Sequence, residues 1–384
     1  MIYFDQAASS YPKPPEVGEA MVHALNNIGA NPGRGSHQLA RQAALIISET
    51  REKAARLFGC SDPRKALFFP NATAALNQAI KGITWSAGDH VIATVLEHNS
   101  IRRPLEYVKR KYGVEVTYVN WDGDTAAFEQ QIWQSIRPGT RLLAMTHASN
   151  VTGSLLPVGQ AAMIAREHSI PILLDASQTA GHLPLNMQDM GIDMLAFPGH
   201  KGLLGPQGTG MLLVEGTIDM EPVQHGGTGS FSEEAENPEQ WPEKFESGTL
   251  NTPGIAGLNA ALNVHESEQD GNVPRETILG QLLRKGLQSI DGITCYGPDK
   301  ENYQLPIVAF NVLDIASQEI AMVLDSHYGI AVRAGLHCSP LAHDFLHTTE
   351  QGVIRASLSK YNTEEEVNRF LEAIQEITES YKML

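Results

Sequence analysis

Cysteine is scarce in this 384-residue sequence, and long hydrophobic runs and clusters of positive charge are missing. Cys60, Cys295 and Cys338 are too few and too scattered for a disulfide framework, which indicates a reducing compartment. No stretch of about 18 apolar residues occurs, so no membrane-spanning helix is predicted. The start, MIYFDQAASS, lacks the basic stretch and apolar run of a signal peptide. These absences predict a cytoplasmic protein without membrane contact.

Positive charge is the next shortage, because 28 Lys and Arg face 44 Asp and Glu, a formal net charge of −16. Binding to nucleic-acid phosphates needs clustered cations, so no nucleic-acid partner is predicted. A hydrophobic fraction of 42%, with 34 glycines and 21 prolines, is typical of a loop-rich globular enzyme. The length allows one large domain and one smaller domain, each with its own core.

Short apolar runs alternate with helical stretches between residues 65 and 215. Strands are predicted at 66–69, 90–95, 141–147, 171–175, 194–197 and 210–214. Their continuous apolar character predicts a mainly parallel sheet covered by helices on both faces. Residues 225–252 have no period, which is typical of a functional loop. After residue 262 a second, α+β unit is predicted, with strands at 292–297, 306–312 and 352–358. It closes on a helix with a capping box, Thr363 and Glu366.

The residues that follow these strands matter most, because ligands of parallel sheets bind beyond the carboxyl ends of the strands. Thr73 lies at a helix N-terminus, which is a natural anion site, although capping of the helix by Asn71 and Thr73 is the more common role of such residues. His98 could be catalytic or structural, and Asp175 could serve a ligand or cap a helix. Lys201 lies in a Gly- and Pro-rich turn flanked by apolar residues, which would lower the pKa of its amine.

Two nucleotide-binding motifs are excluded at the turn that carries Lys201. The Walker loop needs Gly-Lys followed by Ser or Thr, and the sequence reads GHKG; the dinucleotide fingerprint is GxGxxG, and the sequence reads GPQGTG. A helix N-terminus, a histidine, a buried aspartate and a lysine together predict pyridoxal 5'-phosphate as the cofactor. In that interpretation Lys201 forms the Schiff base and Asp175 keeps the pyridinium nitrogen protonated.

The sequence also resembles a known family over nearly its whole length. The motifs that carry the resemblance are FDQAASSYPKP, RGSH (34–37), NATAALN (71–77), EHNS (97–100), HASNVTG (147–153), LDASQTAGHLP (174–184), GHKGLLGPQGTG (199–210), FESGTLNTPGI (245–255), RAGLHC (333–338) and IRASLSKYN (354–362). They resemble the cysteine desulfurases of the class V aminotransferase group, near the selenocysteine lyases. The resemblance implies the α/β fold-type I of pyridoxal-phosphate transferases. It places a large cofactor-binding domain at 21–261, and a small α+β domain at 1–20 and 262–384.

The resemblance further implies roles for individual residues. Lys201 would be the Schiff-base lysine, and Cys338 the nucleophile that forms a persulfide. The cofactor would be held by Ala72, Thr73, His98, Asn150, Asp175, Gln178 and His200, with Thr249 reaching in from the neighbouring subunit of a homodimer. Asn150 and Arg355 would bind the substrate carboxylate, and His98 is a candidate proton donor. The family usually carries hydroxyl side chains where this chain has Ala72 and Pro198, at the phosphate end of the cofactor site.

Cys338 admits three interpretations on its own: an apolar filler, a metal ligand or a nucleophile. Its polar turn argues against the filler, and the nearby histidines lack further ligands at metal spacing, so no metal is predicted. Arg333 and His337 would supply positive charge that favours a thiolate. The predicted function is therefore the conversion of L-cysteine to L-alanine, with a persulfide passed to an unidentified acceptor. Cleavage of L-selenocysteine, transamination and a non-catalytic scaffold are the alternatives.

Overall fold

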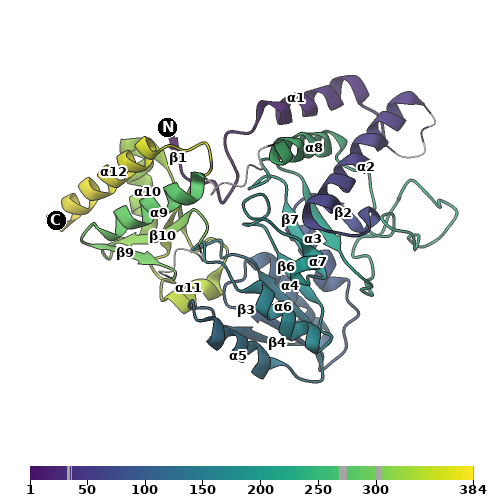
Figure 1. Ribbon diagram of the computed structural model, residues 1–384, viewed down its shortest axis with the longest axis horizontal. Coiled ribbons are helices and arrows are strands. Elements are labelled where there is room, and N and C mark those ends of the chain that lie inside the picture. The colour runs from purple at the N-terminus through teal and green to yellow at the C-terminus, as the bar shows by residue number, and fades with distance from the viewer. Residues whose placement is uncertain (33–34, 36, 268–274, 299–303, 384) are drawn as a thin grey trace.

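The structure is a computed structural model that describes residues 1–32, 35, 37–267, 275–298 and 304–383. Arg34 and Ser36 of the RGSH motif lie outside the described residues. Figure 1 shows a larger unit built on one sheet and, beside it, a smaller unit that contains the C-terminus. Within the described part of the chain, no helix combines the length and the apolar character that a membrane crossing requires.

The larger unit is built on a sheet that, within the described residues, has seven strands in the order β2-β8-β7-β6-β5-β3-β4. In that order the strands are Ala66–Phe69, Gly210–Val214, Met194–Pro198, Ile172–Asp175, Thr140–Thr146, His90–Thr94 and Glu115–Val119. All neighbouring pairs are parallel except those of β8, which is antiparallel to β2 and β7. The predicted mainly parallel sheet is confirmed. The edge strand β4 was not predicted, because it is only half buried and has no continuous apolar run.

Both faces of this sheet are buried, which explains the continuous apolar runs. Along β6, Ile172 and Leu174 belong to one hydrophobic cluster and Leu173 to the cluster on the opposite face. Helices α3 (Ala72–Lys81) and α4 (Asn99–Tyr112) cover the second face, while α2 (Gln38–Phe58), α5 (Thr125–Ser135), α6 (Val158–Glu167), α7 (Met187–Met190) and α8 (Thr252–Ser267) contribute to the first. Helix α1 (Pro15–His23) lies along α8 (Figure 1). Short helical turns also occur at Ala24–Ile28 and Pro63–Lys65.

The smaller unit contains an antiparallel sheet in the order β12-β13-β10-β9. Its strands are Arg333–Gly335, Val353–Ser357, Ile307–Val312 and Ile293–Tyr296, and its helices are α9 (Arg275–Gln288), α10 (Ser317–Val323), α11 (Pro340–Leu346) and α12 (Glu364–Lys382), with a helical turn at Leu324–Tyr328. The predicted capping box of Thr363 and Glu366 begins α12 and is confirmed. In the core of the smaller unit, Phe310 and Phe370 pack edge to face, and Phe4 packs on Phe370.

The N-terminal segment, residues 1–14, contacts both units. Strand β1 (Ile2–Tyr3) pairs with β11 (Ile330–Ala331) of the smaller unit, and the chain then crosses to the larger unit, where α1 begins (Figure 1). The predicted domain boundaries at 20/21 and 261/262 stay a prediction. The predicted loop at 225–252 is confirmed, since no helix or strand lies between His225 and the start of α8 at Thr252.

Candidate active site

Asp175 is the last residue of β6, and its carboxylate lies inside the protein at the carboxyl edge of the sheet. The residue is 2% exposed, and Oδ1 accepts the backbone N–H of Ser177 at 2.9 Å. Burial raises the pKa of this carboxyl, while its hydrogen bonds from Ser177 and the charge of Lys201 lower it. A carboxylate in such a place is stable only if a cation or a hydrogen-bond donor meets it, which is what a protonated ring nitrogen would offer.

Lys201 lies in the turn between β7 and β8, which we call the lysine turn (residues 199–205). Desolvation, opposed by the charge of Asp175 and assisted by the positive charges of Arg355 and Arg333, lowers the pKa of its amine to about 8. The turn packs closely: a Cβ on Gly202 would lie 2.5 Å from the carbonyl oxygen of Ala180, so the residue after Lys201 has to be glycine. An amine with this pKa is partly unprotonated near neutral pH and can act as a nucleophile or a base.

The backbone of the lysine turn is held by the N-terminal segment. The carbonyl oxygen of His200 accepts hydrogen bonds from the backbone N–H of Ser10 at 3.0 Å, from its hydroxyl at 3.1 Å, and from Lys13 Nζ at 2.8 Å. Burial lowers the pKa of Lys13 to about 8. Ser10 and Lys13 lie in the quoted FDQAASSYPKP motif, but the sequence indicated no role for them. They contact the lysine turn only because the N-terminal segment crosses from one unit to the other.

His98 is the N-cap of α4, four residues after β3 ends at Thr94. Its Nδ1 accepts the backbone N–H of Ser100 at 3.1 Å, so the proton of the neutral ring is on Nε2. Burial and the charges of Lys201 and Arg333 lower the pKa of His98 to about 4. The imidazole is therefore neutral at physiological pH, with Nε2–H as its donor.

Glu97 is a buried acid that sequence reasoning missed, although EHNS places it at the end of an apolar strand. Its Oε1 accepts from Thr94 Oγ1 at 2.5 Å and from the backbone N–H of Thr146 at 3.0 Å, which ties β3 to β5. Among the described residues its Oε2 has no hydrogen-bond partner. Burial raises the pKa of Glu97 to about 8, with a smaller contribution from the charge of Asp175. The side chain is therefore an uncharged carboxylic acid near neutral pH.

The residues predicted at the phosphate end come from three segments. Helix α3 begins after Asn71, whose side chain caps Ala74 at 2.9 Å, and Thr73 is on its exposed first turn beside the buried Ala72. His200 carries a buried Nδ1 that has no hydrogen-bond partner among the described residues, and burial lowers the pKa of this histidine to about 4.

Thr249 is the third predicted phosphate ligand, and it lies on a different segment from Thr73 and His200. It is exposed, just before α8. The segment that carries it is anchored nearby, where Glu246 accepts two hydrogen bonds from Arg51 at 2.9 and 2.8 Å in a buried ion pair. Thr249 therefore lies on the surface of this chain.

The predicted carboxylate site contains one buried cation. Arg355, on β13, is 1% exposed; its Nη1 donates to the carbonyl oxygen of Asn150 and its Nη2 to Asp5 Oδ1, both at 2.8 Å. Arg333 lies directly opposite Arg355 in the pairing of β12 with β13. Asp5 was not predicted. Gln178, predicted at the cofactor ring, donates through Nε2 to the carbonyl oxygen of Ala7 at 3.3 Å, also in the N-terminal segment.

Cys338 lies in a short turn between β12 and α11, which we call the cysteine turn (residues 335–339). His337 and Cys338 both have positive φ, 48° and 59°, and the cysteine is exposed and unpaired. The backbone N–H of Asn99, next to His98, donates to the carbonyl oxygen of Cys338 at 2.8 Å. The amide of Asn150 donates to the carbonyl oxygen of His337 at 2.7 Å and accepts from Ser339 Oγ at 2.6 Å. The backbone is fixed and the thiol is accessible.

The prediction that His337 supplies positive charge to the thiol is wrong. The ring is buried, and its Nε2 lies 3.0 Å from the carbonyl oxygen of Val353, which it can contact only as a donor. Burial, followed by the charge of Arg355, lowers the pKa of His337 to about 3, so it is neutral at physiological pH. The sequence carries no signal for this, because the ring is buried against β13, where Val353 lies 16 residues further along the chain.

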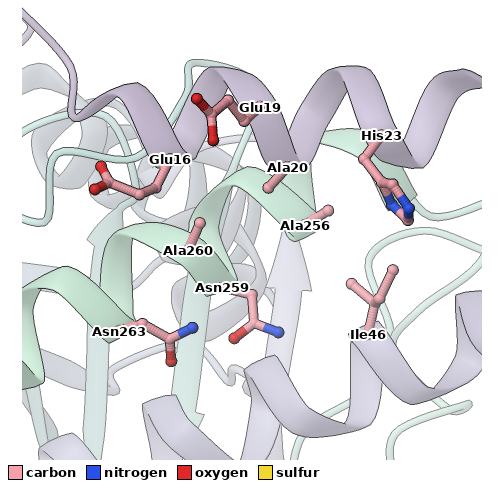
Figure 2. Close-up of a pocket in the computed structure, with 9 residues that line it drawn as sticks. All are labelled: Glu16, Glu19, Ala20, His23, Ile46, Ala256, Asn259, Ala260 and Asn263. Carbon is pink, nitrogen blue, oxygen red and sulfur yellow. The ribbon is translucent and has the colours of Figure 1, made fainter.

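No group of three or more metal-ligating side chains occurs among the described residues. The neighbouring His343 is buried, with its Nδ1 2.8 Å from the hydroxyl of Thr348. An open cleft of about 370 Å³ lies elsewhere, between α1, α2 and α8 (Figure 2). Glu16, Glu19 and His23 of α1 line it, with Asn259 and Asn263 of α8 on its other side (Figure 2). None of the predicted site residues lines this cleft.

Known proteins resemble this chain over nearly its whole length. The family model described as aminotransferase class-V matches residues 2–370. A probable cysteine desulfurase of Methanothermobacter thermautotrophicus is 34% identical over 383 residues, 98% of this chain and 94% of that protein. A probable cysteine desulfurase of Halalkalibacterium halodurans is 32% identical over 392 residues, 99% of this chain and 94% of that protein. The apo structure of a cysteine desulfurase from Thermococcus onnurineus NA1 matches with a TM-score of 0.91 and 32% identity, covering 99% of this chain and 95% of that chain.

Proposed function

This chain belongs to the aminotransferase class-V family, and on that premise we propose that it is a cysteine desulfurase. The resemblance stated from the sequence is confirmed, and so is the fold class, that of fold-type I pyridoxal-phosphate enzymes. The observation that carries the proposal is the pair of turns in one chain: a desolvated Lys201 beside a buried Asp175, and an exposed Cys338 held to the residue after His98.

Pyridoxal 5'-phosphate is the cofactor that we propose, because the residues present fit its parts. Asp175 offers a buried carboxylate to a protonated ring nitrogen, and Lys201 offers an amine to the aldehyde. His200 carries a buried Nδ1 that has no partner among the described residues and suits a phosphate oxygen. When bound, this cofactor stabilises negative charge on the carbon next to the substrate amino group.

Further residues are proposed to complete the cofactor site. His98 would lie against the ring, Gln178 near its hydroxyl, and the start of α3 with Thr73 would take the phosphate. Ala72 and Pro198 donate no side-chain hydrogen bond, so backbone N–H groups at the start of α3 and the partner subunit have to supply more of the phosphate contacts.

The residues of this chain divide the chemistry between them. Arg355 binds the substrate carboxylate, with Asn150 holding both the guanidinium and the cysteine turn. The amine of Lys201 accepts and returns protons at Nζ, since its pKa of about 8 makes both forms accessible. His98 can donate a proton from Nε2.

Cys338 receives the sulfur. The carbon–sulfur bond of L-cysteine breaks, a sulfur–sulfur bond to Cys338 Sγ forms, and the proton of the thiol is balanced by the one that completes the methyl group of L-alanine. The resulting persulfide is a sulfur donor to an acceptor thiol. An exposed thiol on a fixed turn suits this transfer, because a second protein can reach it.

A homodimer is part of the proposal, with Thr249 of each subunit contributing to the phosphate site of the other. The exposure of Thr249 on an anchored segment supports it. We also propose a cytoplasmic location, supported by the scarcity of cysteine, with only three in 384 residues.

The proposal is tested by incubating the purified holoenzyme with L-cysteine, with and without a thiol reductant as acceptor. Formation of L-alanine, together with mass spectrometry that finds one added sulfur atom on Cys338, is the expected result. Formation of a keto acid instead of L-alanine would support transamination and overturn the proposal.

A further inference from the structure

Arg355 is a fully buried cation, and such a group is costly unless an anion meets it. The structure supplies that anion from the far end of the chain. Asp5 Oδ1 lies 2.8 Å from Arg355 Nη2, while the other terminal nitrogen donates to a neutral carbonyl. Asp5 is therefore the counter-ion that the fold itself provides at the proposed carboxylate site.

Asp5 is presented to Arg355 by a fixed backbone. Asp5 forms a β-bridge with Ser357, two residues after Arg355, and Phe4 accepts the backbone N–H of Ser357 at 2.8 Å. The hydroxyl of Tyr3 and the backbone N–H of Ala8 both donate to the carbonyl oxygen of Asp5, at 3.2 and 3.1 Å. The carboxylate cannot leave Arg355 by movement of the chain without breaking these bonds.

Arg355 can still bind a second acceptor. A guanidinium carries five N–H donors, the two described contacts use one on each terminal nitrogen, and Nε has no partner among the described residues. A substrate carboxylate on the same guanidinium would lie near the Asp5 carboxylate. Two like charges that share one cation repel, so each weakens the binding of the other.

We propose that Asp5 is a positioning and specificity-determining residue that keeps Arg355 oriented between turnovers and weakens the binding of the α-carboxylate of substrate and product. The inference rests on the proposed function, because it takes Arg355 as the site of that carboxylate. Asp5 also acts electrostatically on Lys201, in the opposite sense to Arg355, which supports its place within the site. A carboxylate that is bound less tightly leaves more readily, so Asp5 favours release of L-alanine.

The test compares two ligands that differ only in the carboxylate, L-alanine and L-alaninamide, by calorimetric titration of the holoenzyme. Asp5→Asn keeps an oxygen for Arg355 but removes the charge. It is expected to bind L-alanine about five- to tenfold more tightly, with L-alaninamide unchanged within about twofold. Asp5→Glu keeps the charge and should behave as the parent does. Asp291→Asn is the matched control, because it removes the same charge from an exposed pair with Lys382.

An Asp5→Asn variant that binds L-alanine no more tightly than the parent, or that tightens both ligands equally, overturns the inference. Should Asp5→Asn fail to fold, the same comparison is made with Asp5→Ser, which also lacks the charge. The parent is assayed in parallel for L-alanine formation from L-cysteine. A parent enzyme that forms no L-alanine would contradict the proposed function. If the parent is active but Asp5→Asn binds the two ligands as the parent does, only the role of Asp5 is contradicted.

Discussion

The backbones of the lysine turn and the cysteine turn are held in the same way, but their reactive side chains differ in exposure to solvent. In each, distant residues fix a backbone carbonyl at the reactive residue or just before it: Ser10 and Lys13 bind that of His200, and Asn150 binds that of His337. The reactive side chains are left out of these bonds. Lys201 is desolvated enough to change its pKa, whereas Cys338 is exposed.

The difference shows two routes to a reactive group. Lys201 is reactive because its surroundings change the protonation of its amine, which requires burial and nearby charges. The role of Cys338 depends instead on the fixed position of its turn, because the neutral His337 adds no charge beside the thiol. A change to the lysine turn should therefore affect every substrate, and a change to the cysteine turn only those whose sulfur has to be taken by a thiol.

The largest effect is expected from Lys201→Ala. The amine of Lys13, which also reaches the lysine turn, is bound to the carbonyl oxygen of His200 and does not replace Nζ, so turnover of both L-cysteine and L-selenocysteine should fall about a thousandfold or more. The visible absorption band of the bound cofactor should shift toward that of the free aldehyde. A variant that kept both the band and the turnover would show that Lys201 is not the reactive lysine.

Cys338→Ala should separate the two substrates. L-alanine formation from L-cysteine is expected to fall about a hundredfold, because no thiol remains to take the sulfur. L-selenocysteine should lose only a few-fold, since selenium leaves more readily than sulfur. The absorption band of the cofactor should be unchanged, because Cys338 lies outside the lysine turn.

Product assays with both amino acids, on the same enzyme preparation, measure this separation. Cysteine turnover within a few-fold of the parent would make Cys338 a bystander and would favour another class V reaction. Cys60→Ala is the control, because that thiol is buried in the core and its pKa is raised to about 11 by desolvation.

The sequence predicted the strands whose two faces are buried, together with the residues at their ends. It missed β4, an edge strand, the short strands β1, β11 and β12, and the contacts made by the N-terminal segment. Asp5 and Lys13 could not be placed, because their partners Arg355 and His200 lie 350 and 187 residues away and meet them only in the fold. His337 was misjudged for the same reason: its charge is set by burial, which neighbouring letters do not reveal.

Lys13→Met tests how the lysine turn is held. The variant loses the charged donor to the carbonyl oxygen of His200, while both hydrogen bonds from Ser10 remain. Turnover of L-cysteine and L-selenocysteine should fall equally, about fivefold, because the amine of Lys201 is less well positioned. Ser339→Ala, which loosens the cysteine turn instead, should lower only cysteine turnover. Steady-state rates with both substrates distinguish the two, and unequal losses in Lys13→Met would contradict the comparison.

The smallest effect on turnover is expected from two buried groups, Glu97 after β3 and His337 in the cysteine turn, which act on stability with opposite dependence on pH. Glu97 has a pKa of about 8 in the folded protein and about 4.5 in the unfolded chain, so the folded state binds more protons between these values. The parent therefore loses stability as pH rises from 4.5 to 8. Glu97→Gln removes this pH-dependent contribution, and its stability relative to the parent should grow by up to about 1.4 kcal/mol per pH unit as pH rises.

His337, with a pKa lowered to about 3, binds fewer protons when folded, so its contribution to stability is lost as pH falls below about 6.5. Denaturant unfolding from pH 5 to 8 should show His337→Gln gaining relative stability toward acid and Glu97→Gln toward alkali; parallel curves would mean that neither group changes protonation on unfolding.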